Sequence, residues 1–527
     1  MKTTHCLPLV AFSLLLPAVS AAETTDPLDQ IFVTASRSPV EISQLGAAVT
    51  VIDRNEIERR EARNIGELLR SVPGFAVSHT GVVGSQTQIR VRGAEANHIL
   101  VLIDGIRATD PATGDEFRWE YLSTASIERV EVVRGAQSAL WGSDALAGVV
   151  NIITRPSQAA SSLQGYAESG SFSTLNAGFD GSFSGNGWSV GGGVEHLSTD
   201  GQNVSRSGPE DDESDLTTAS VNVRFDATEA VQLFGSLRAV DAYSQFDPVD
   251  FVFTGLPADG DVATETTNLY GNVGIRIDGD RVNHSVQLDY FDSDNDNLTD
   301  GVVGSSTSSD RTTLGYQATL SLGINRLVLA AEHEQTNFRQ RGSFPFGDPN
   351  QDQEMDTTSA IVEYQGLSHE RFSWIASARF DSNSDFDDAV NGRLSAAYAL
   401  SGDTTLRASA GTGRKNPTFT ERYGFFPGQF VGNPDLKPER SASYDVGLDH
   451  TFAEGAASLQ LSLFKQDLED EINGFVFDPD TFLSTAENMS GTSKRDGVEV
   501  AMNWRVSSDV DLGMHYTYTD SRDEQAA

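Results

Sequence analysis

The run Asp292-Ser293-Asp294-Asn295-Asp296-Asn297 has residue types and spacing that could bind a cation. Carboxylate and amide oxygens at alternate positions are the ligands with which an EF-hand loop begins to hold Ca²⁺. Such a loop also needs a glycine at its sixth position and a carboxylate at its twelfth, where this chain has Asn297 and Val303. The run is therefore predicted to be part of a surface loop, residues 292–310, and not a calcium site.

The residues that usually carry catalysis are scattered or missing. The nine histidines do not cluster, and the chain contains neither G-x-S-x-G nor H-E-x-x-H. The only cysteine, Cys6, precedes an apolar stretch that ends at Ser20-Ala21-Ala22, a pattern typical of a cleaved signal peptide over residues 1–22. A mature chain without cysteine excludes disulfides, thiol catalysis and cysteine metal sites. We therefore expect an exported protein that is not an enzyme.

The charge of the chain argues against nucleic acid as a partner. The formal net charge is -39 and the pI is about 4.4, so the phosphates of nucleic acid would be repelled. Six charged residues nevertheless lie on or beside strands expected early in the chain: Arg90, Arg92, Arg107, Arg129, Glu131 and Arg134. Two interpretations stay open. They form a solvated face of a soluble domain, or they lie inside a polar lumen and are paired there with wall charges or water.

The elements that must position these residues begin with a compact α+β domain. A helix is predicted between an N-cap at Asp53 or Asn55 and the end signal Pro73-Gly74. Its apolar positions have helical spacing: Ile57, Ile65, Leu68 and Leu69. Strands are expected at residues 49–52, 88–91, 98–103, 130–133 and 149–154.

From about residue 163 onward the pattern changes to apolar and polar residues in alternation. It predicts roughly eighteen strands, joined alternately by tight turns such as Asp278-Gly279-Asp280 and by long acidic loops. The long loops are expected at residues 199–215, 241–261, 292–310, 336–356 and 414–439. Short turns at one rim and long loops at the other are typical of a large antiparallel transmembrane β-barrel.

Near the start, the heptapeptide Asp29-Gln30-Ile31-Phe32-Val33-Thr34-Ala35 is apolar and β-branched in a polar arm. It suits addition as a strand to another protein's sheet, although it could equally be the first strand of the domain that follows. Further segments are LLRSVPGF, IRVRG, VLIDGIR and IERVEVVRG between residues 68 and 135, then GNPDLKPERSASYDVG at 432–447 and GVEVAMNW at 497–504. In this order, the heptapeptide and these segments resemble the TonB-dependent outer-membrane receptors.

The resemblance implies a division of the chain. Residues 23–36 would be a periplasmic arm whose TonB box is Asp29 to Ala35, residues 37–157 a plug, and residues 158–527 a barrel around it. Family barrels usually have about 22 strands, so the barrel is expected to be incomplete at its C-terminal end. The implied location is the Gram-negative outer membrane, and the chain is expected to be a monomer in outer-membrane lipid. The implied partner is TonB with the inner-membrane energising complex.

The resemblance also implies active uptake of a scarce small-molecule nutrient. Within the family, the cobalamin-importing members are the most similar. A siderophore or haem importer remains the alternative, and a passive porin or adhesin barrel is the alternative from another class. Ligand contacts are expected at two loops of the plug apex: Thr80, Val82, Val83, Ser85, Gln86, Thr109, Asp110, Thr113 and Phe117.

No cofactor is required by this function, but family likeness suggests structural Ca²⁺ in the early extracellular loops. Carboxylates in two neighbouring loops could supply the oxygen ligands that Ca²⁺ prefers. The residues expected to do so are Asp200, Asp211, Asp212, Asp215, Asp241 and Asp247. A metal-free, solvated acidic loop is the alternative, because the chain is acidic throughout.

Overall fold

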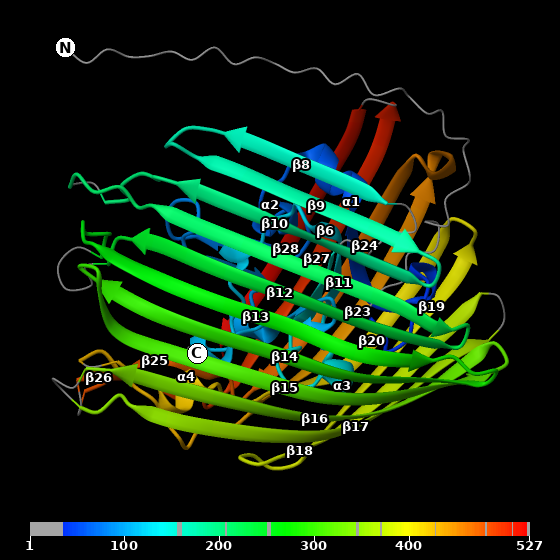
Figure 1. Ribbon diagram of the computed structural model, residues 1–527. Coiled ribbons are helices and arrows are strands. Elements are labelled where there is room, and N and C mark those ends of the chain that lie inside the picture. Colours follow the sequence, from blue (N-terminus) through cyan, green and yellow to red (C-terminus); the bar gives the residue numbers. More distant parts are fainter. Residues whose placement is uncertain are drawn as a thin grey trace, which may run out of the picture.

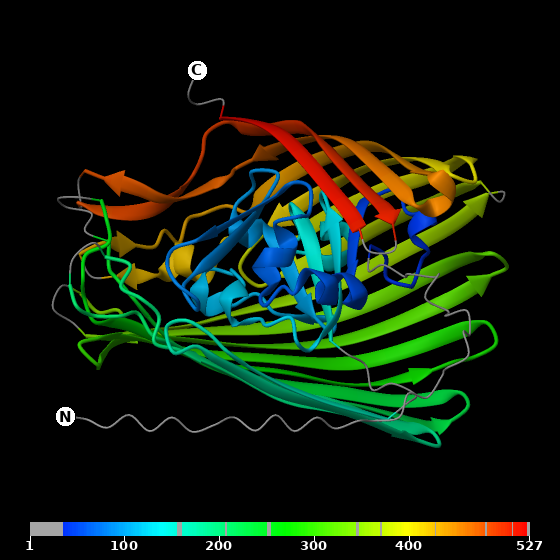
Figure 2. The same ribbon diagram turned by 90° about the horizontal axis from the view of Figure 1, so that it is seen from above.

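A computed structural model describes residues 35–154, 161–205, 208–249, 255–343, 347–368, 371–426, 428–479, 482–507 and 510–523. It consists of an inner domain (residues 35–154) and a wall of long, tilted strands (residues 162–523), and Figures 1 and 2 show the wall curving around the inner domain. This confirms the predicted mostly-β barrel fold with an N-terminal plug. Among the described residues, no helix is long and apolar enough to cross a bilayer.

The inner domain is built on a five-stranded sheet in the order β1-β6-β7-β4-β5. Its strands are β1 (Ala48–Asp53), β4 (Ile99–Ile103), β5 (Ile106–Arg107), β6 (Ile127–Arg134) and β7 (Gly148–Thr154). A separate hairpin joins β2 (Phe75–His79) to β3 (Thr87–Val91). Because β4 and β7 pair in parallel near the centre, β4 is buried throughout and is continuously apolar, and β7 is buried over its first five residues, which are apolar apart from Gly148 and Asn151.

The predicted single helix is wrong, because the structure has two short helices, α1 (Arg54–Arg60) and α2 (Ile65–Leu69). The chain turns between them at Glu61, whose φ of 49° is left-handed. Each helix has its own N-cap: the Asp53 carboxylate accepts from the Glu56 amide, and the Asn64 side chain accepts from the Glu67 amide. The other described helices of the inner domain are α3 (Ser138–Trp141) and the one-turn 3₁₀ helices η2 (Ile42–Gln44), η3 (Ala96–His98), η4 (Pro111–Thr113) and η5 (Trp119–Tyr121).

The wall contains seventeen strands within the described residues, and consecutive strands pair antiparallel. The first nine are β8 (Ser162–Ser169), β9 (Leu175–Gly185), β10 (Trp188–Thr199), β11 (Ser214–Thr228), β12 (Val231–Phe246), β13 (Val262–Ile277), β14 (Val282–Thr299), β15 (Val302–Leu322) and β16 (Asn325–Gly342). The others are β17 (Gln351–Ser368), β18 (Phe372–Asn383), β19 (Ala389–Ser401), β20 (Thr404–Lys415), β23 (Glu439–Phe452), β24 (Ala457–Glu469), β27 (Thr492–Ser507) and β28 (Val510–Asp523).

The prediction of a loop at residues 292–310 is wrong. Most of it is the outer end of the β14–β15 hairpin, whose turn is confined to Asp300 and Gly301. Alternation explains the error: Ser293 and Asn295 point inward and are buried, so the acidic residues between them occupy the other face of a strand. Strands likewise extend into the ends of the loops expected at residues 241–261 and 336–356.

Side chains of the wall alternate between a polar interior and an apolar exterior. On β15, Arg311 is 5% exposed and faces inward, whereas Leu314 and Tyr316 are 52% and 44% exposed. An outward apolar face is what a lipid-embedded strand requires. The core is shared between the two parts, since wall residues such as Val240 and Phe291 join the apolar cluster of the inner domain.

The long connections gather at one rim, at the left of Figure 2, and the short turns at the opposite rim. The connection after β20 contains α4 (Phe419–Tyr423). A capping box between Thr418 and Glu421 stabilises the N-terminus of this helix. A small sheet in the order β21-β22-β26-β25 covers this rim, and its strands are β21 (Phe425–Phe426), β22 (Phe430–Val431), β25 (Ile472–Asp478) and β26 (Leu483–Asn488). A further 3₁₀ turn, η6 (Ala453–Gly455), lies between β23 and β24.

Candidate functional site

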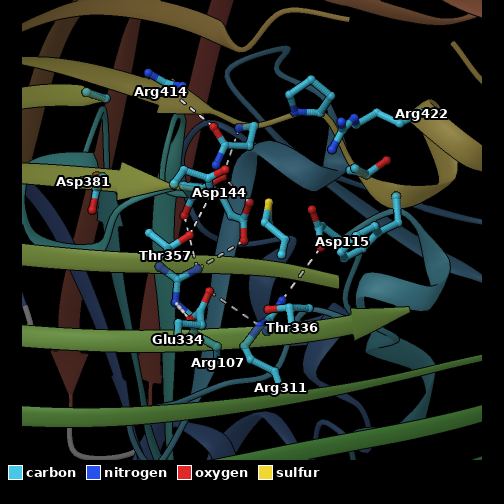
Figure 3. A pocket seen from close by; sticks show the side chains of 18 of the residues that line it. Arg107, Asp115, Asp144, Arg311, Glu334, Thr336, Thr357, Asp381, Arg414 and Arg422 are labelled. Atoms are coloured by element: carbon cyan, nitrogen blue, oxygen red, sulfur yellow. Dashed lines mark hydrogen bonds and ion pairs between the residues drawn. The ribbon is translucent and has the colours of Figure 1, made fainter. Parts of the chain in front are cut away.

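A cavity opens between the inner domain, the wall and α4 on the side of the long loops; we call it the outer cavity (Figure 3). The inner domain contributes Arg107, at the end of β5, Asp115, after η4, and the segment Ser143-Asp144 after α3. Inward-facing residues of β15–β18 and the residues around α4 supply the rest of the lining. Because three separate parts of the chain meet here, a ligand in this cavity would contact all of them.

Arginine is concentrated in this cavity although the whole chain is acidic. Five arginines line it: Arg107, Arg311, Arg379, Arg414 and Arg422. Four of them form ion pairs, for example Arg379 with Asp381 at 2.6 Å and Arg107 with Glu334 at 3.5 Å. Arg414 hydrogen-bonds to the Asn416 side chain at 3.1 Å and forms no ion pair with the described residues. The cavity thus offers guanidinium donors to a polar or anionic ligand.

A lysine of the wall ties two loops of the inner domain together at the edge of the outer cavity. Lys415 is 1% exposed, and its Nζ lies 2.8 Å from both Asp115 and Asp144. Burial would raise the pKa of Asp144, but the nearby Lys415 and Arg107 outweigh it and lower that pKa to about 2. Asp144 therefore remains charged at neutral pH, and the clamp holds the apex of the inner domain against the wall.

The first predicted apex loop lies beside another part of the wall. Thr80, Val83 and Gln86 are exposed, Val82 is half-buried and Ser85 is buried. The loop packs on β11 and β12: the Ser244 hydroxyl donates to the Gly84 carbonyl at 2.9 Å. None of these predicted residues lines the outer cavity. Their role as ligand contacts stays a prediction.

The second predicted apex loop is anchored to the wall. The Asp110 carboxylate accepts hydrogen bonds from Ser293 and Ser309 at 2.9 Å and from Asn295 at 3.1 Å. Thr109 is fully buried, and Phe117 is buried in the core with its ring edge-on to Trp119. Thr113 is half-buried. The groups of Asp110 are thus engaged in positioning the loop, which leaves its neighbour Asp115 to line the outer cavity.

Four charged residues form a buried charge cluster between the inner domain and the wall: Arg92, Arg134, Asp445 and Glu499. Arg92 contacts Asp445 and Glu499 at 2.8 Å each, and Arg134 contacts Glu499 at 3.0 Å. Gly74 packs so closely that a Cβ there would lie 2.3 Å from Glu499 Oε1, which explains glycine in the LLRSVPGF segment. For Arg92 and Arg134 the lumen interpretation is correct, because both are buried and paired with wall carboxylates.

Of the predicted TonB box, Asp29 to Thr34 lie outside the described residues. Ala35 is described and fully buried, in an apolar cluster that includes Leu45 and Ile375. The chain that follows is held by both parts of the protein: Arg37 forms an ion pair with Glu332 of β16 at 2.5 Å and donates to the Leu140 carbonyl at 3.1 Å. Tension on the arm would therefore reach the wall and α3 directly.

The structure brings together part of the predicted calcium set. Oxygens of Glu210, Asp247 and Asp259 lie within 4.8 Å of one another, and Asp212 is 1% exposed nearby. Glu210 Oε1 and Asp212 Oδ1 are buried with no hydrogen-bond partner in the described part of the chain. Burial raises the pKa of both carboxyls, and the surrounding carboxylates raise it further. Unsatisfied oxygens that repel one another fit a hard cation.

The other predicted calcium residues are placed differently. Asp211 accepts from the Asn203 amide at 3.3 Å at the margin of the cluster. Asp215 and Asp241 belong to β11 and β12 and are exposed, because the inward positions of those strands are the even-numbered residues such as Leu216 and Ala242. Asp200 is exposed beyond β10. Asp200, Asp215 and Asp241 do not join the cluster, which contains Asp259 and Glu210 instead. Their role as calcium ligands stays a prediction.

Sequence reasoning missed the outer-cavity residues Arg311, Arg379, Arg414 and Arg422. A signal for the first two exists, because each is a cation at an inward position of a wall strand in a chain of net negative charge. Their convergence depends on the pairing of distant strands and is not visible in the sequence.

Family models match two parts of the chain. Residues 41–149 match the TonB-dependent receptor plug domain, and residues 304–527 match the β-barrel of TonB-dependent receptors. The vitamin B12 transporter BtuB of Photobacterium profundum is 28% identical over 460 residues, which cover 86% of this chain and 72% of that protein. BtuB of Vibrio vulnificus (strain CMCP6) is 26% identical over 513 residues, covering 93% and 78%.

Solved structures share the fold at lower identity. The siderophore receptor PirA from Acinetobacter baumannii superposes with a TM-score of 0.74 at 17% identity, covering 89% of this chain and 80% of that one. The alcaligin outer-membrane receptor FauA from Bordetella pertussis gives 0.71 at 16% identity, covering 96% and 86%. At such identities the likeness establishes the architecture alone.

Proposed function

This chain belongs to the family of TonB-dependent receptors, and we propose that it is an outer-membrane importer of a corrinoid of the cobalamin class. The assignment of a corrinoid as the substrate rests on the similarity to vitamin B12 transporters over most of both chains. Members of this family take up nutrients through TonB and are not enzymes. We accordingly expect no chemistry on the solute.

The outer cavity is the proposed place of first contact for the ligand. It faces the rim of the long loops, which is extracellular in barrels of this kind, and its guanidinium and carboxylate groups suit a polar group of the solute. Ligand contact there would act on Asp115 and Asp144, and thus on the Lys415 clamp between the inner domain and the wall. The arm would then be engaged by TonB in the periplasm through strand addition.

A siderophore is the second candidate, because five arginines in one cavity would suit an anionic iron chelate. Haem has less support. No histidine lines the outer cavity among the described residues, and His333 is exposed and hydrogen-bonded to Thr358.

Growth of a strain that requires external vitamin B12 tests the substrate. We expect the full receptor to restore growth on nanomolar cyanocobalamin and purified receptor to bind it tightly. The Arg414→Ala variant tests the site itself. It removes the one cavity arginine that forms no ion pair with the described residues, and it should weaken ligand binding. If the receptor does not bind cyanocobalamin but lets a ferric siderophore rescue iron-starved cells, the second candidate function is the correct one.

For the metal we propose Ca²⁺ held by Glu210, Asp212, Asp247 and Asp259, where its charge would offset the repulsion between these carboxylates. Raised pKa values mean that the charged cluster costs stability at neutral pH, and that this cost disappears as the pH falls and the carboxyls protonate. We expect Ca²⁺ to raise the melting temperature at pH 7, by the equivalent of about 2.7 kcal/mol at ~100 times Kd. The rise should shrink toward pH 4.5, the ordinary pKa of glutamate.

Two variants control this measurement. Glu210→Gln removes an unpartnered ligand and should abolish the Ca²⁺-dependent shift, whereas Asp241→Asn changes an exposed carboxylate outside the cluster and should keep it. An equal response of the two variants to Ca²⁺ would refute the proposed metal site.

A further inference from the structure

A second and larger cavity lies on the side of the short turns, between the inner domain and β13–β16; we call it the inner cavity. Its volume is about 780 Å³, which is in the range of small-molecule binding sites. The lining is rich in amide and hydroxyl side chains, including Asn283, Ser285, Gln287, Gln317 and Thr319. Such groups bind a solute that itself carries amides or hydroxyls.

The outer and inner cavities are joined by a shared row of wall residues. A small intermediate cavity shares Arg107, Arg311 and Glu334 with the outer cavity, and Trp141, Thr313 and Glu332 with the inner one. Every second residue of β15 faces this row, and the inward positions run from the outer to the inner rim as Arg311, Thr313, Gly315, Gln317, Thr319 and Ser321. One continuous polar track thus runs along the wall past the inner domain.

Trp141, the last residue of α3, lines both the intermediate and the inner cavity. Its backbone carbonyl accepts a hydrogen bond from Arg107 on the outer side, and the Arg37 guanidinium lies 4.8 Å from its ring centre on the inner side. The indole nitrogen of Trp141 is buried without a hydrogen-bond partner in the described part of the chain, and the ring packs on one side against the apolar cluster of Leu100 and Leu102. Arg37 directly follows the predicted arm, so movement of the arm would remove the inner support of the ring.

We propose, on the basis of the import function above, that the inner cavity is a second ligand-holding site for a polar solute rich in amide or hydroxyl groups, and that Trp141 and Arg107 close it from the outer cavity. A ligand leaves the outer cavity along β15 when these two side chains move. It then rests among the amides of β14 and β15 before its release into the periplasm.

The competing route is a lateral cavity of about 440 Å³ between α1 and β8–β11. Its lining includes Arg54, Glu58 and Gln164. It shares no lining residue with the outer or the intermediate cavity. A small fifth cavity does share Thr154, Ser220 and Asn222 with the lateral cavity, and Ile106 with the intermediate one. The lateral cavity is therefore a second route, and separate blocking variants are needed to tell the two routes apart.

A liposome-swelling assay with arabinose tests the closure without requiring TonB or any nutrient. We expect receptor carrying Arg107→Ala and Trp141→Ala to admit arabinose several-fold faster than the unchanged receptor. Adding Gly315→Trp should suppress this leak, since a Cβ at Gly315 has no neighbour closer than 4.0 Å and the ring can fill the inner cavity. Adding Gln164→Trp, in the lateral cavity, should leave the leak unchanged. Heat-modifiable migration on gels checks that each barrel is folded.

Uptake of cyanocobalamin gives the second readout. In the otherwise unchanged receptor, Gly315→Trp and Ser285→Trp should preserve surface binding and reduce uptake, whereas Gln164→Trp should reduce neither. Absence of a leak, a leak stopped by Gln164→Trp, or full uptake through Gly315→Trp would overturn the inner-cavity route. If no variant or parent binds cyanocobalamin, the corrinoid assignment fails, and the swelling result still decides the route.

Discussion

Replacement of Glu499 by alanine is expected to destabilise the inner domain within the wall by about 3–5 kcal/mol, the usual consequence of removing one partner from a buried ion pair. Glu499 is 2% exposed and accepts from Arg92 and Arg134, which are equally inaccessible to water. Without it, Arg134 keeps no carboxylate partner among the described residues, and Arg92 keeps only Asp445. The Arg134 guanidinium would then be buried, with no carboxylate partner of its own, next to a second guanidinium.

Urea titration of purified receptor, followed by protease accessibility of the inner domain, measures this effect. Asp352→Ala is a matched control, because Asp352 also pairs with two arginines but is 66% exposed. Exposed ion pairs contribute about 0–1 kcal/mol, so this variant should unfold at nearly the urea concentration of the parent. Similar midpoints for Glu499→Ala and Asp352→Ala would show that the buried charge cluster does not hold the inner domain.

Deletion of residues 29–34 is expected to reduce cyanocobalamin uptake to the level of cells that lack TonB, while surface binding is preserved. The physical reason is that the apolar, β-branched segment is the strand that we expect the chain to offer to TonB, whereas the lining of the cavities comes from the described residues that follow it. The deletion stops before Ala35, because that side chain is fully buried against the wall and its removal would disturb packing.

Replacing residues 23–28 by a Gly/Ser linker of equal length is the matched control, and it should leave uptake intact. Binding and uptake are measured with radiolabelled cyanocobalamin in energised and de-energised cells. Undiminished uptake after the deletion would contradict the energised-importer function and favour a passive porin. Loss of binding together with uptake would instead indicate that the arm supports the fold.

The fold was largely predictable because its signals are periodic. Alternation over residues 163–523 predicts a barrel, and the structure confirms the outward apolar face that lipid requires. The errors occurred where local signals compete. The acidic run at residues 292–297 has the composition of a loop, yet pairing with β13 and β15 makes it a strand. Similarly, helical spacing from Ile57 to Leu69 ignores the left-handed turn at Glu61.

The candidate site was less predictable because its residues are far apart in the sequence. Asp110 is expected to contact ligand, and that expectation stays a prediction; its hydrogen bonds to hydroxyl and amide groups of β14 and β15 were not visible in the sequence. Among the acidic residues, Asp259 joins the carboxylate cluster without having been expected there, and Asp241 lies outside it, because only strand register decides which carboxylates face one another.

The sequence by itself determined the class of this protein: the ordered segments from LLRSVPGF to GVEVAMNW indicate a TonB-dependent receptor, and strand periodicity indicates a barrel. Tertiary structure alone decided what these segments do together. Arg92, Arg134, Asp445 and Glu499 come from four of the segments and meet in one buried charge cluster. Ion pairing, cavity lining and the closure at Trp141 depend on distances of a few ångströms between residues hundreds of positions apart, and only the packing of the inner domain against the wall sets those distances.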